Sequence, residues 1–466
     1  MSKNTTKKKQ PKIFGTDGVR GTANVEPVTA ETALKLGRSA AHVFKNLESQ
    51  PRDRGKHRIV IGKDTRLSGY MLENAISSGI LSMGVDVLFI GPLPTPGVAY
   101  ATRSLRADAG IVITASHNPY DDNGIKFFGP DGYKLADKIE NEVERLVFSG
   151  DIEYVRPRPE EIGKAVRIDD AQGRYIENAK ASFPRRMTLD GMRIVVDCAN
   201  GATYKATPTV LRELGAETFV YGNRPDGTNI NKECGSMHPE HLCEKVKEYR
   251  ADIGIAHDGD GDRVLLVDEH GGVMDGDDIM AICALDLLAK NRLANKTLVA
   301  TVMSNAGLDQ ALRKAGGEVV RTPVGDKNVI DEMLRNGYNF GGEESGHLIF
   351  SDYSSTGDGL VAALQVLSTM KEKDLRLSRL RKCWTRFPKK VTNIRVKEKP
   401  PFEKLDGVMD LVKAAEKDVT PNGGRVLLRY SGTEPKARLL IEGSDTALIE
   451  MWSRKIADLL KKLIGA

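Results

Sequence analysis

The sequence predicts an α/β protein with three similar α/β domains containing mixed sheets, followed by a smaller C-terminal α+β domain. Short apolar runs typical of buried strands alternate with segments whose apolar residues recur at helical spacing. The alternation repeats three times at a period of about 100 residues, which indicates one fold used three times. At 466 residues the chain is too long for one core, and about three or four domains are expected.

We expect five segments along the chain. They are a disordered basic tail over residues 1–11, α/β domains over 12–162, 163–270 and 271–378, and the α+β domain over 379–466. A linker-like run of Pro, Arg and Glu at residues 156–161 suggests the first boundary.

The elements follow from the apolar pattern. In the first domain, apolar residues at helical spacing over 30–46 precede a βαβ pattern and a further strand. Its elements are a strand at 59–62, a helix at 71–83, a strand at 85–90, a helix after the turn at 91–96 and a strand at 109–113. The second domain has helices at 169–182, 205–214 and 238–249 and strands at 193–197, 216–221 and 251–256. The third has helices at 276–290, 306–314, 326–335 and 357–371 and strands at 297–303, 317–321 and 338–341. The last has strands at 386–396, 424–429 and 437–442 and helices at 402–416 and 445–463.

Composition excludes several classes of protein. The formal charge of +5 equals the number of lysines up to residue 12, so the rest of the chain is balanced, which argues against a nucleic-acid-binding body. No apolar stretch is long enough to cross a membrane, and the polar N-terminus is no secretory signal. Five scattered cysteines without a CxxC pair favour a reducing cytoplasm and give no zinc signal.

A serine follows the strand at 109–113, in the sequence Thr-Ala-Ser-His-Asn-Pro (114–119). Ligands bind at the carboxyl ends of strands in open α/β sheets, and Lys126 lies close enough in sequence to return to the same pocket. In extended chain Ser116 and His117 point opposite ways, which argues against a simple Ser-His proton relay. A serine that carries a phosphoryl group is the alternative, although these residue types also suit an ordinary turn.

Residues 257–263 read His-Asp-Gly-Asp-Gly-Asp-Arg. In extended chain Asp258, Asp260 and Asp262 point to one side, and their mutual repulsion favours a bound cation. Oxygen ligands suit Mg²⁺ or Ca²⁺. The spacing to Glu269 mimics an EF-hand, but Arg263 stands where that loop needs glycine and the flanks are strand-like, so an EF-hand is rejected.

Three glycine-containing loops suit sugar and phosphate. Residues 14–21 hold Arg20 among three glycines, and 341–347 (Gly-Gly-Glu-Glu-Ser-Gly-His) offer alternating polar groups for vicinal hydroxyls. Residues 429–435 (Arg-Tyr-Ser-Gly-Thr-Glu-Pro) can cradle a phosphate. The loops at 14–21 and 341–347 also suit an ordinary turn. The chain has no Walker A, nucleophile-elbow or dinucleotide motif.

Together and in this order, the four loops at 114–119, 257–263, 341–347 and 429–435 resemble those of the α-D-phosphohexomutase superfamily, over nearly the whole chain. The resemblance implies four domains in a heart shape around a central cleft. It implies that Ser116 is a phosphoserine which, with Asp258, Asp260 and Asp262, binds one Mg²⁺. It implies Lys126 as acid/base or electrostatic partner, beside the catalytic residues Arg20, His117 and Asn118. The substrate-binding residues that it implies are Arg263, Lys327, Glu343, Ser345, His347, Arg429, Ser431, Gly432 and Thr433.

The implied reaction is an isomerisation of a phosphorylated hexose or hexosamine by phosphoryl transfer through a bisphosphate, with a sugar 1,6-bisphosphate as activator. Residues 14–21 and 122–128 look most like those of phosphoglucosamine mutases, which predicts glucosamine phosphates as substrates. That subfamily usually has Gln where Glu344 stands and Arg where Lys327 stands, so phosphomannomutase/phosphoglucomutase activity is the alternative. A metal-dependent sugar phosphatase is a further one. The protein is expected to be a cytoplasmic monomer or homodimer without nucleic-acid or membrane partners.

Overall fold

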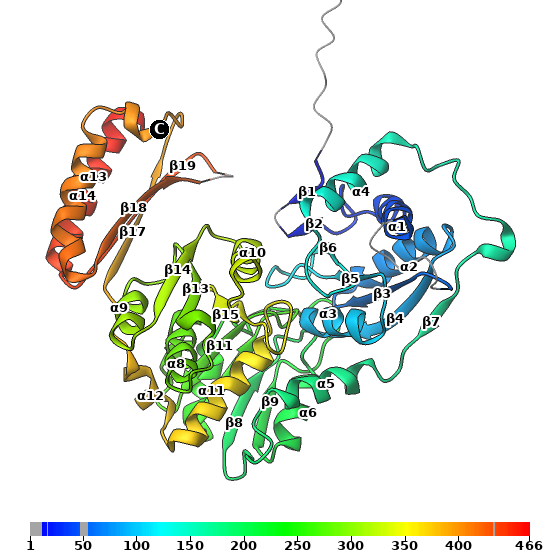
Figure 1. Ribbon diagram of the computed structural model, residues 1–466, viewed down its shortest axis with the longest axis horizontal. Coiled ribbons are helices and arrows are strands. Elements are labelled where there is room, and N and C mark those ends of the chain that lie inside the picture. Colours follow the sequence, from blue (N-terminus) through cyan, green and yellow to red (C-terminus); the bar gives the residue numbers. More distant parts are fainter. Residues whose placement is uncertain (1–11, 16, 47–54, 432–433) are drawn as a thin grey trace, which may run out of the picture.

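The computed structural model describes residues 12–15, 17–46, 55–431 and 434–466. Its strands form four sheets within these ranges. We call the parts of the chain that carry the four sheets the first to fourth units. They follow one another along an arc, with the first and fourth units at its two ends (Figure 1). The tail at 1–11 lies outside the described residues, so its expected disorder stays a prediction.

The first unit has a mixed seven-stranded sheet in the order β1-β2-β6-β5-β3-β4-β7. The strands are β1 (Phe14–Gly15), β2 (Gly18–Thr22), β3 (Arg58–Lys63), β4 (Asp86–Pro92), β5 (Ala109–Ile113), β6 (Asp122–Phe128) and β7 (Ala165–Arg167). The helices are α1 (Ala30–Lys45), α2 (Ser68–Leu81), α3 (Thr95–Ser104) and α4 (Asp137–Ser149). β7 lies beyond the boundary expected at residue 162 but pairs with β4, so the chain still belongs to this sheet there.

The second and third units repeat the mixed α/β pattern. The second sheet has the order β12-β11-β10-β8-β9 and the third β14-β13-β15-β16. The second contains β8 (Arg193–Asp197), β9 (Glu217–Tyr221), β10 (Ile253–His257), β11 (Val264–Asp268) and β12 (Val273–Met274), with α5 (Ala171–Ala181), α6 (Ala206–Glu213) and α7 (Glu240–Glu248). The third contains β13 (Thr297–Thr301), β14 (Glu318–Thr322), β15 (Phe340–Gly342) and β16 (Leu348–Phe350), with α8 (Gly276–Ala289), α9 (Gly307–Lys314), α10 (Asp326–Asn336), α11 (Gly359–Lys373) and α12 (Leu377–Leu380).

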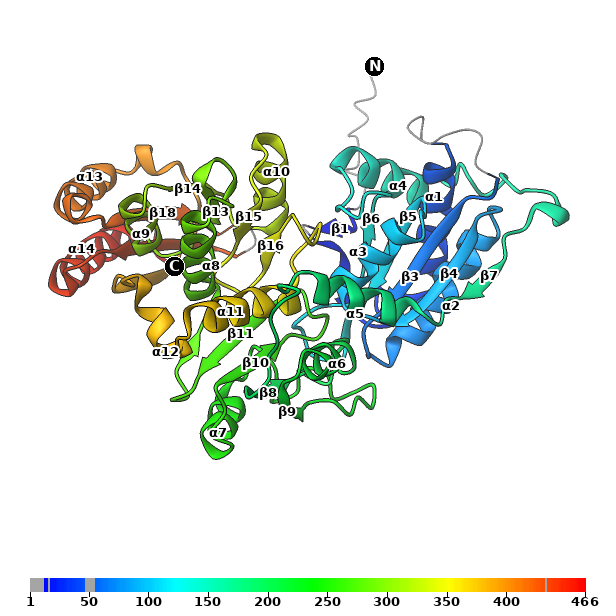
Figure 2. The ribbon, with the colours of Figure 1, turned by 60° about the horizontal axis from the view of Figure 1, so that its bottom comes forward.

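The fourth unit is the α+β domain that the sequence predicts. Its antiparallel sheet β17-β19-β18 consists of β17 (Lys389–Arg395), β18 (Arg425–Tyr430) and β19 (Lys436–Glu442). Helices α13 (Val408–Val419) and α14 (Thr446–Ile464) lie side by side against the sheet and share a separate core with it (Figures 1 and 2). The helix expected over 402–416 starts later than predicted, because Gly407 has a left-handed φ of 70° directly before it.

Local sequence explains most elements and misses some. Strand β5 is apolar and fully buried, as its composition predicts. Strand β6, which the sequence analysis did not assign, contains Asn, Gly and Lys, all poor strand formers. It forms because it pairs antiparallel with β5 on one side and β2 on the other. No helix within the described ranges is both long and apolar enough to span a membrane.

Candidate active site

The serine loop follows β5, and its backbone differs from the extended chain assumed above. Ser116 has a left-handed φ of 52° and is 1% exposed. Its N–H donates to Thr114 Oγ1 at 2.9 Å. Because the backbone turns here, Ser116 Oγ lies 3.4 Å from His117 Nδ1, so the expectation that the two side chains point apart was wrong. Burial, followed by the charges of Arg263 and Arg20, lowers the pKa of His117 to about 4 and keeps its ring neutral.

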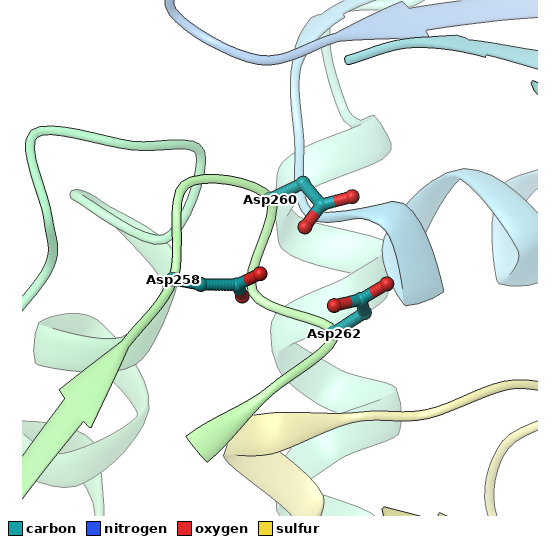
Figure 3. A group of neighbouring side chains, drawn as sticks. All are labelled: Asp258, Asp260 and Asp262. Carbon is teal, nitrogen blue, oxygen red and sulfur yellow. The ribbon is translucent and has the colours of Figure 1, made fainter. Parts of the chain in front are cut away.

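The aspartate loop joins the antiparallel strands β10 and β11 of the second unit. It is a turn with a left-handed Gly261 rather than extended chain, yet oxygens of Asp258, Asp260 and Asp262 lie within 4.8 Å of one another. Figure 3 shows the three side chains turned toward a common space. Ser116 Oγ donates to Asp258 Oδ2 at 2.6 Å, so the first and second units meet at this pair of atoms. Glu269, the residue that mimicked an EF-hand ligand, instead accepts a hydrogen bond from Ser378.

The electrostatics of this loop fit a bound cation. The three aspartates are buried, and within the described residues the Oδ1 atoms of Asp260 and Asp262 accept no hydrogen bond. Burial and the neighbouring carboxylates raise the pKa of Asp258 well above its usual range, and burial with Asp260 raises that of Asp262. A cation with oxygen preference would neutralise these charges and use the free oxygens, so the three aspartates can hold a metal ion.

Lys126 lies on β6 among carboxylates. Its Nζ is 3.0 Å from Asp17 Oδ2, 3.2 Å from Asp260 Oδ2 and 3.6 Å from Asp262 Oδ2. Burial alone would lower the pKa of Lys126, but the three carboxylates outweigh burial and raise it. The lysine also lowers the pKa of Asp260, against the effect of burial. Lys126 is therefore held as a cation.

The third unit contributes His347, which is 3% exposed. Residues 263 and 347 form an antiparallel bridge, which brings the loop at 341–347 beside the aspartate loop. His347 Nε2 lies 3.9 Å from Asp262 Oδ2 and 3.7 Å from Asp326 Oδ2. Arg263 Nε is 4.0 Å from Asp262 Oδ1. These two residues thus lie beside Ser116, Asp258, Asp260 and Asp262, which we call the serine–aspartate cluster.

The remaining predicted residues lie around this cluster or apart from it. Arg20 pairs with Asp17, and Asn118 Nδ2 donates to Asp122 Oδ2 at 3.0 Å. Glu343 accepts a hydrogen bond from the N–H of Gly325 at 3.0 Å, and Ser345 is exposed. Lys327 pairs with Asp137 of the first unit.

The loop at 429–435, which the sequence predicts to cradle a phosphate, belongs to the fourth unit. Ser431 is buried there, and Arg429 Nη2 lies 3.9 Å from Met303 Sδ. Among the described residues, no hydrogen bond or ion pair joins Arg429 or Ser431 to the serine–aspartate cluster. Gly432 and Thr433 lie outside the described residues.

Three polar residues of the site were missed from sequence. Asp17 pairs with Lys126, Arg20 and Lys134, and Lys134 also pairs with Asp326 of the third unit. Thr95, at the start of α3, donates through Oγ1 to Asp260 Oδ2 at 2.7 Å. Asp17 belongs to the loop at 14–21, and an acidic residue three positions before Arg20 could have been predicted to pair with a nearby cation. Thr95 had no such local signal, because its partner is 165 residues away.

Family models match the chain in four parts. The descriptions are phosphoglucomutase/phosphomannomutase α/β/α domain I over residues 11–153, domain II over 173–272, domain III over 275–387 and the C-terminal domain over 391–459. The chain belongs to the phosphoglucomutase/phosphomannomutase family. A solved family member from Burkholderia thailandensis has a TM-score of 0.78 and 27% identity, with 97% of each chain covered.

Within this family, two relatives that are similar to this chain over nearly their whole length are named phosphoglucosamine mutase. A phosphoglucosamine mutase from Geobacter metallireducens is 57% identical over 97% of this chain and 99% of its own length. One from Geotalea daltonii is 56% identical over 97% of this chain and 98% of its own.

Proposed function

We propose that this chain interconverts glucosamine 6-phosphate and glucosamine 1-phosphate, with phosphorylated Ser116 as the phosphoryl donor and a sugar 1,6-bisphosphate as intermediate and activator. The observation that carries the proposal is the 2.6 Å hydrogen bond from Ser116 Oγ to Asp258 Oδ2, which joins a serine to three clustered buried carboxylates. The full-length similarity to proteins named phosphoglucosamine mutase supports the choice of sugar.

The aspartates at 258, 260 and 262 are proposed to hold one Mg²⁺ together with an oxygen on Ser116. The unbonded oxygens of Asp260 and Asp262 support this ligand set, since a hard cation takes oxygen ligands. When bound, the cation stabilises negative charge on the transferring phosphoryl group.

The chain's own residues have separable tasks in this proposal. A sugar hydroxyl attacks the phosphorus, the bond from phosphorus to Ser116 Oγ breaks, and Lys126, as a cation, stabilises the charge left on that oxygen. In-line attack puts the sugar hydroxyl on the far side of phosphorus from Ser116 Oγ, so its proton is released to solvent. His117 is neutral and 3.4 Å from Ser116 Oγ, so its ring can accept the serine proton when Oγ attacks the bisphosphate in the return transfer. Arg20 pairs with Asp17, which also pairs with Lys126, and Asn118 belongs to the same loop as Ser116; both are proposed to position the transferring group.

The third and fourth units are proposed to hold the sugar phosphate. Glu343, Ser345 and His347 bind the sugar hydroxyls. Arg263 and Lys327 also bind the substrate. The phosphate that is not transferred is held by the loop that contains Arg429, Ser431, Gly432 and Thr433. A separate phosphate anchor lets the bisphosphate bind in either orientation and return a phosphoryl group to serine.

One observation bears on the substrate. Glu344, where phosphoglucosamine mutases usually have Gln, pairs with Lys389 of the fourth unit. This pairing gives the Glu344 carboxylate a structural partner, so the departure from the usual residue does not by itself require a different sugar. The five free cysteines support the expected reducing cytoplasm as the place of action.

The experiment compares kcat/KM for glucosamine, mannose and glucose 6-phosphates, with Mg²⁺ and a bisphosphate primer present. The proposal expects a clear preference for glucosamine 6-phosphate, whereas a preference for mannose or glucose would contradict it. Ser116→Ala is expected to abolish turnover and to lose phosphate incorporation, measured by intact mass, while the fold is retained. Phosphate release without an isomerised sugar would instead indicate a phosphatase.

A further inference from the structure

The carbonyl oxygens of the serine loop are held from the second unit by one side chain. Asn231 Nδ2 donates to Ser116 O at 2.8 Å and to Asn118 O at 2.9 Å. Asn231 is 7% exposed and lies in the irregular segment between β9 and α7. Its own N–H donates to Ala199 O at 2.9 Å, which ties the segment to the loop after β8.

The same two carbonyls are also held from the first unit. Arg66 is fully buried, and its Nη2 donates to Ser116 O at 3.2 Å and to Asn118 O. Its Nη1 pairs with Asp64, so the guanidinium is fixed in place. Each carbonyl therefore has one donor from the first unit and one from the second.

Asn231 also touches the aspartate loop. A Cβ on Gly259 would lie 2.7 Å from Ser116 O and 2.8 Å from Asn231 Nδ2. The serine loop, the aspartate loop and Asn231 thus meet at one point with no space between them. Any displacement of the Asn231 amide alters how these two loops lie against each other.

Ser116 needs such support because its backbone is left-handed, a conformation that is costly for a residue with a side chain. Strained residues of this kind persist only where the surroundings hold them. We infer that Asn231 is a positioning residue for phosphoryl transfer: its amide holds the Ser116 loop in register with the aspartate loop across the boundary between two units. The inference rests on the proposed function of Ser116.

Two variants at position 231 test the inference without backbone strain. Asn231 has φ 57°, which Gly adopts freely and Asp tolerates. Asn231→Gly removes both donors. Asn231→Asp keeps the size and shape but places a carboxylate against two carbonyl oxygens.

We expect kcat to fall by about ten- to a hundredfold in Asn231→Gly, and further in Asn231→Asp, with KM within about twofold. A packing role predicts the opposite order, because Asp fills the space and Gly leaves it empty. Asn229→Ala removes two hydrogen bonds of a half-buried side chain within the same segment, to Arg224 O and from the N–H of Asp226, but none to the serine loop. It should keep kcat within about twofold.

A second readout does not depend on the reaction. Calorimetric titration with Mg²⁺ should give a dissociation constant about three- to tenfold higher in both variants than in the parent, because the Ser116 oxygen no longer faces Asp258. Parental kcat and parental Mg²⁺ affinity in Asn231→Gly, or a smaller loss in Asn231→Asp than in Asn231→Gly, would overturn the inference. A parent protein that binds Mg²⁺ but isomerises no sugar phosphate would refute the proposed function alone. The titration would still test whether Asn231 holds the serine loop in place against the aspartate loop.

Discussion

Gly259 offers a sharp test of how closely the serine and aspartate loops must approach each other. It lies between Asp258 and Asp260, and its φ is outside the left-handed region, so alanine can adopt the same backbone. The perturbation in Gly259→Ala is therefore the added methyl group. That methyl would lie 2.7 Å from Ser116 O, 2.7 Å from Ile230 Cδ1 and 2.8 Å from Asn231 Nδ2.

The contact with Ile230 relaxes more easily than the contacts with Ser116 and Asn231. The Ile230 methyl ends a side chain that can rotate away, whereas Ser116 O is backbone and is held by Arg66 and Asn231. To reach a distance of 3.0 to 3.4 Å, the carbonyl or the aspartate loop must move by about 0.3 to 0.7 Å. A misplacement of about 1 Å can lower a rate by a hundredfold, so we expect kcat to fall by about tenfold. Overpacking of this kind also costs about 1–3 kcal/mol of stability.

The assay measures glucosamine 1-phosphate formation at saturating Mg²⁺, with KM determined in parallel. Gly173→Ala in α5 is the matched control, because its methyl would meet no atom within 4 Å. This control should keep its kcat and gain about 0.5–1 kcal/mol, since alanine is the better helix former. Parental kcat in Gly259→Ala would refute the reasoning that this junction sets the position of Ser116.

Three further predictions concern other parts of the chain. Arg429→Ala should raise KM by about tenfold or more with kcat retained, because a phosphate anchor contributes uniform binding; a loss confined to kcat would contradict this. Glu344→Gln should leave kcat/KM for glucosamine 6-phosphate within about threefold, since the carboxylate pairs with Lys389, and a switch in sugar preference would refute it. Asp358→Asn should stabilise the fold above pH 6 by up to about 3 kcal/mol and have little effect below pH 4. Burial raises the pKa of Asp358 to about 6, although it accepts a hydrogen bond from Tyr175, so the free energy of unfolding falls as pH rises through about 4 to 6. Denaturant unfolding of parent and variant at pH 4 and pH 7 measures the difference, and equal effects at both values would contradict it.

The parts of the site that sequence predicts are those encoded by local spacing. Asp258, Asp260 and Asp262 converge as their period-two spacing suggested, although the loop is a turn rather than extended chain. The serine lies at the carboxyl end of a buried strand, as the apolar run before it predicted. Local pattern suffices here because each group is delivered by the strand next to it in sequence.

The parts that sequence missed depend on contacts between distant segments. Thr95, Arg66 and Asn231 look like an ordinary turn residue, a surface arginine and a loop asparagine until the units are docked. Asn231 meets Ser116 across 115 residues of chain, and no periodicity encodes that contact. The predicted orientation of His117 was wrong for a related reason. The left-handed backbone of Ser116, which turns the two side chains toward each other, is supported by these same distant donors.

The arrangement of contacts also predicts how variants should divide between kcat and KM. The groups proposed to react lie where the first two units join, and two polar contacts between those units also hold these groups in place: Thr95 to Asp260 and Asn231 to Ser116. A change there cannot loosen the junction without moving Ser116 or an aspartate, so it should act on kcat. The fourth unit has no such link to the reacting groups within the described residues, so changes in its phosphate loop should act on KM. A kcat effect from the fourth unit at saturating substrate would mean that its loop moves the reacting groups as well as holding the phosphate.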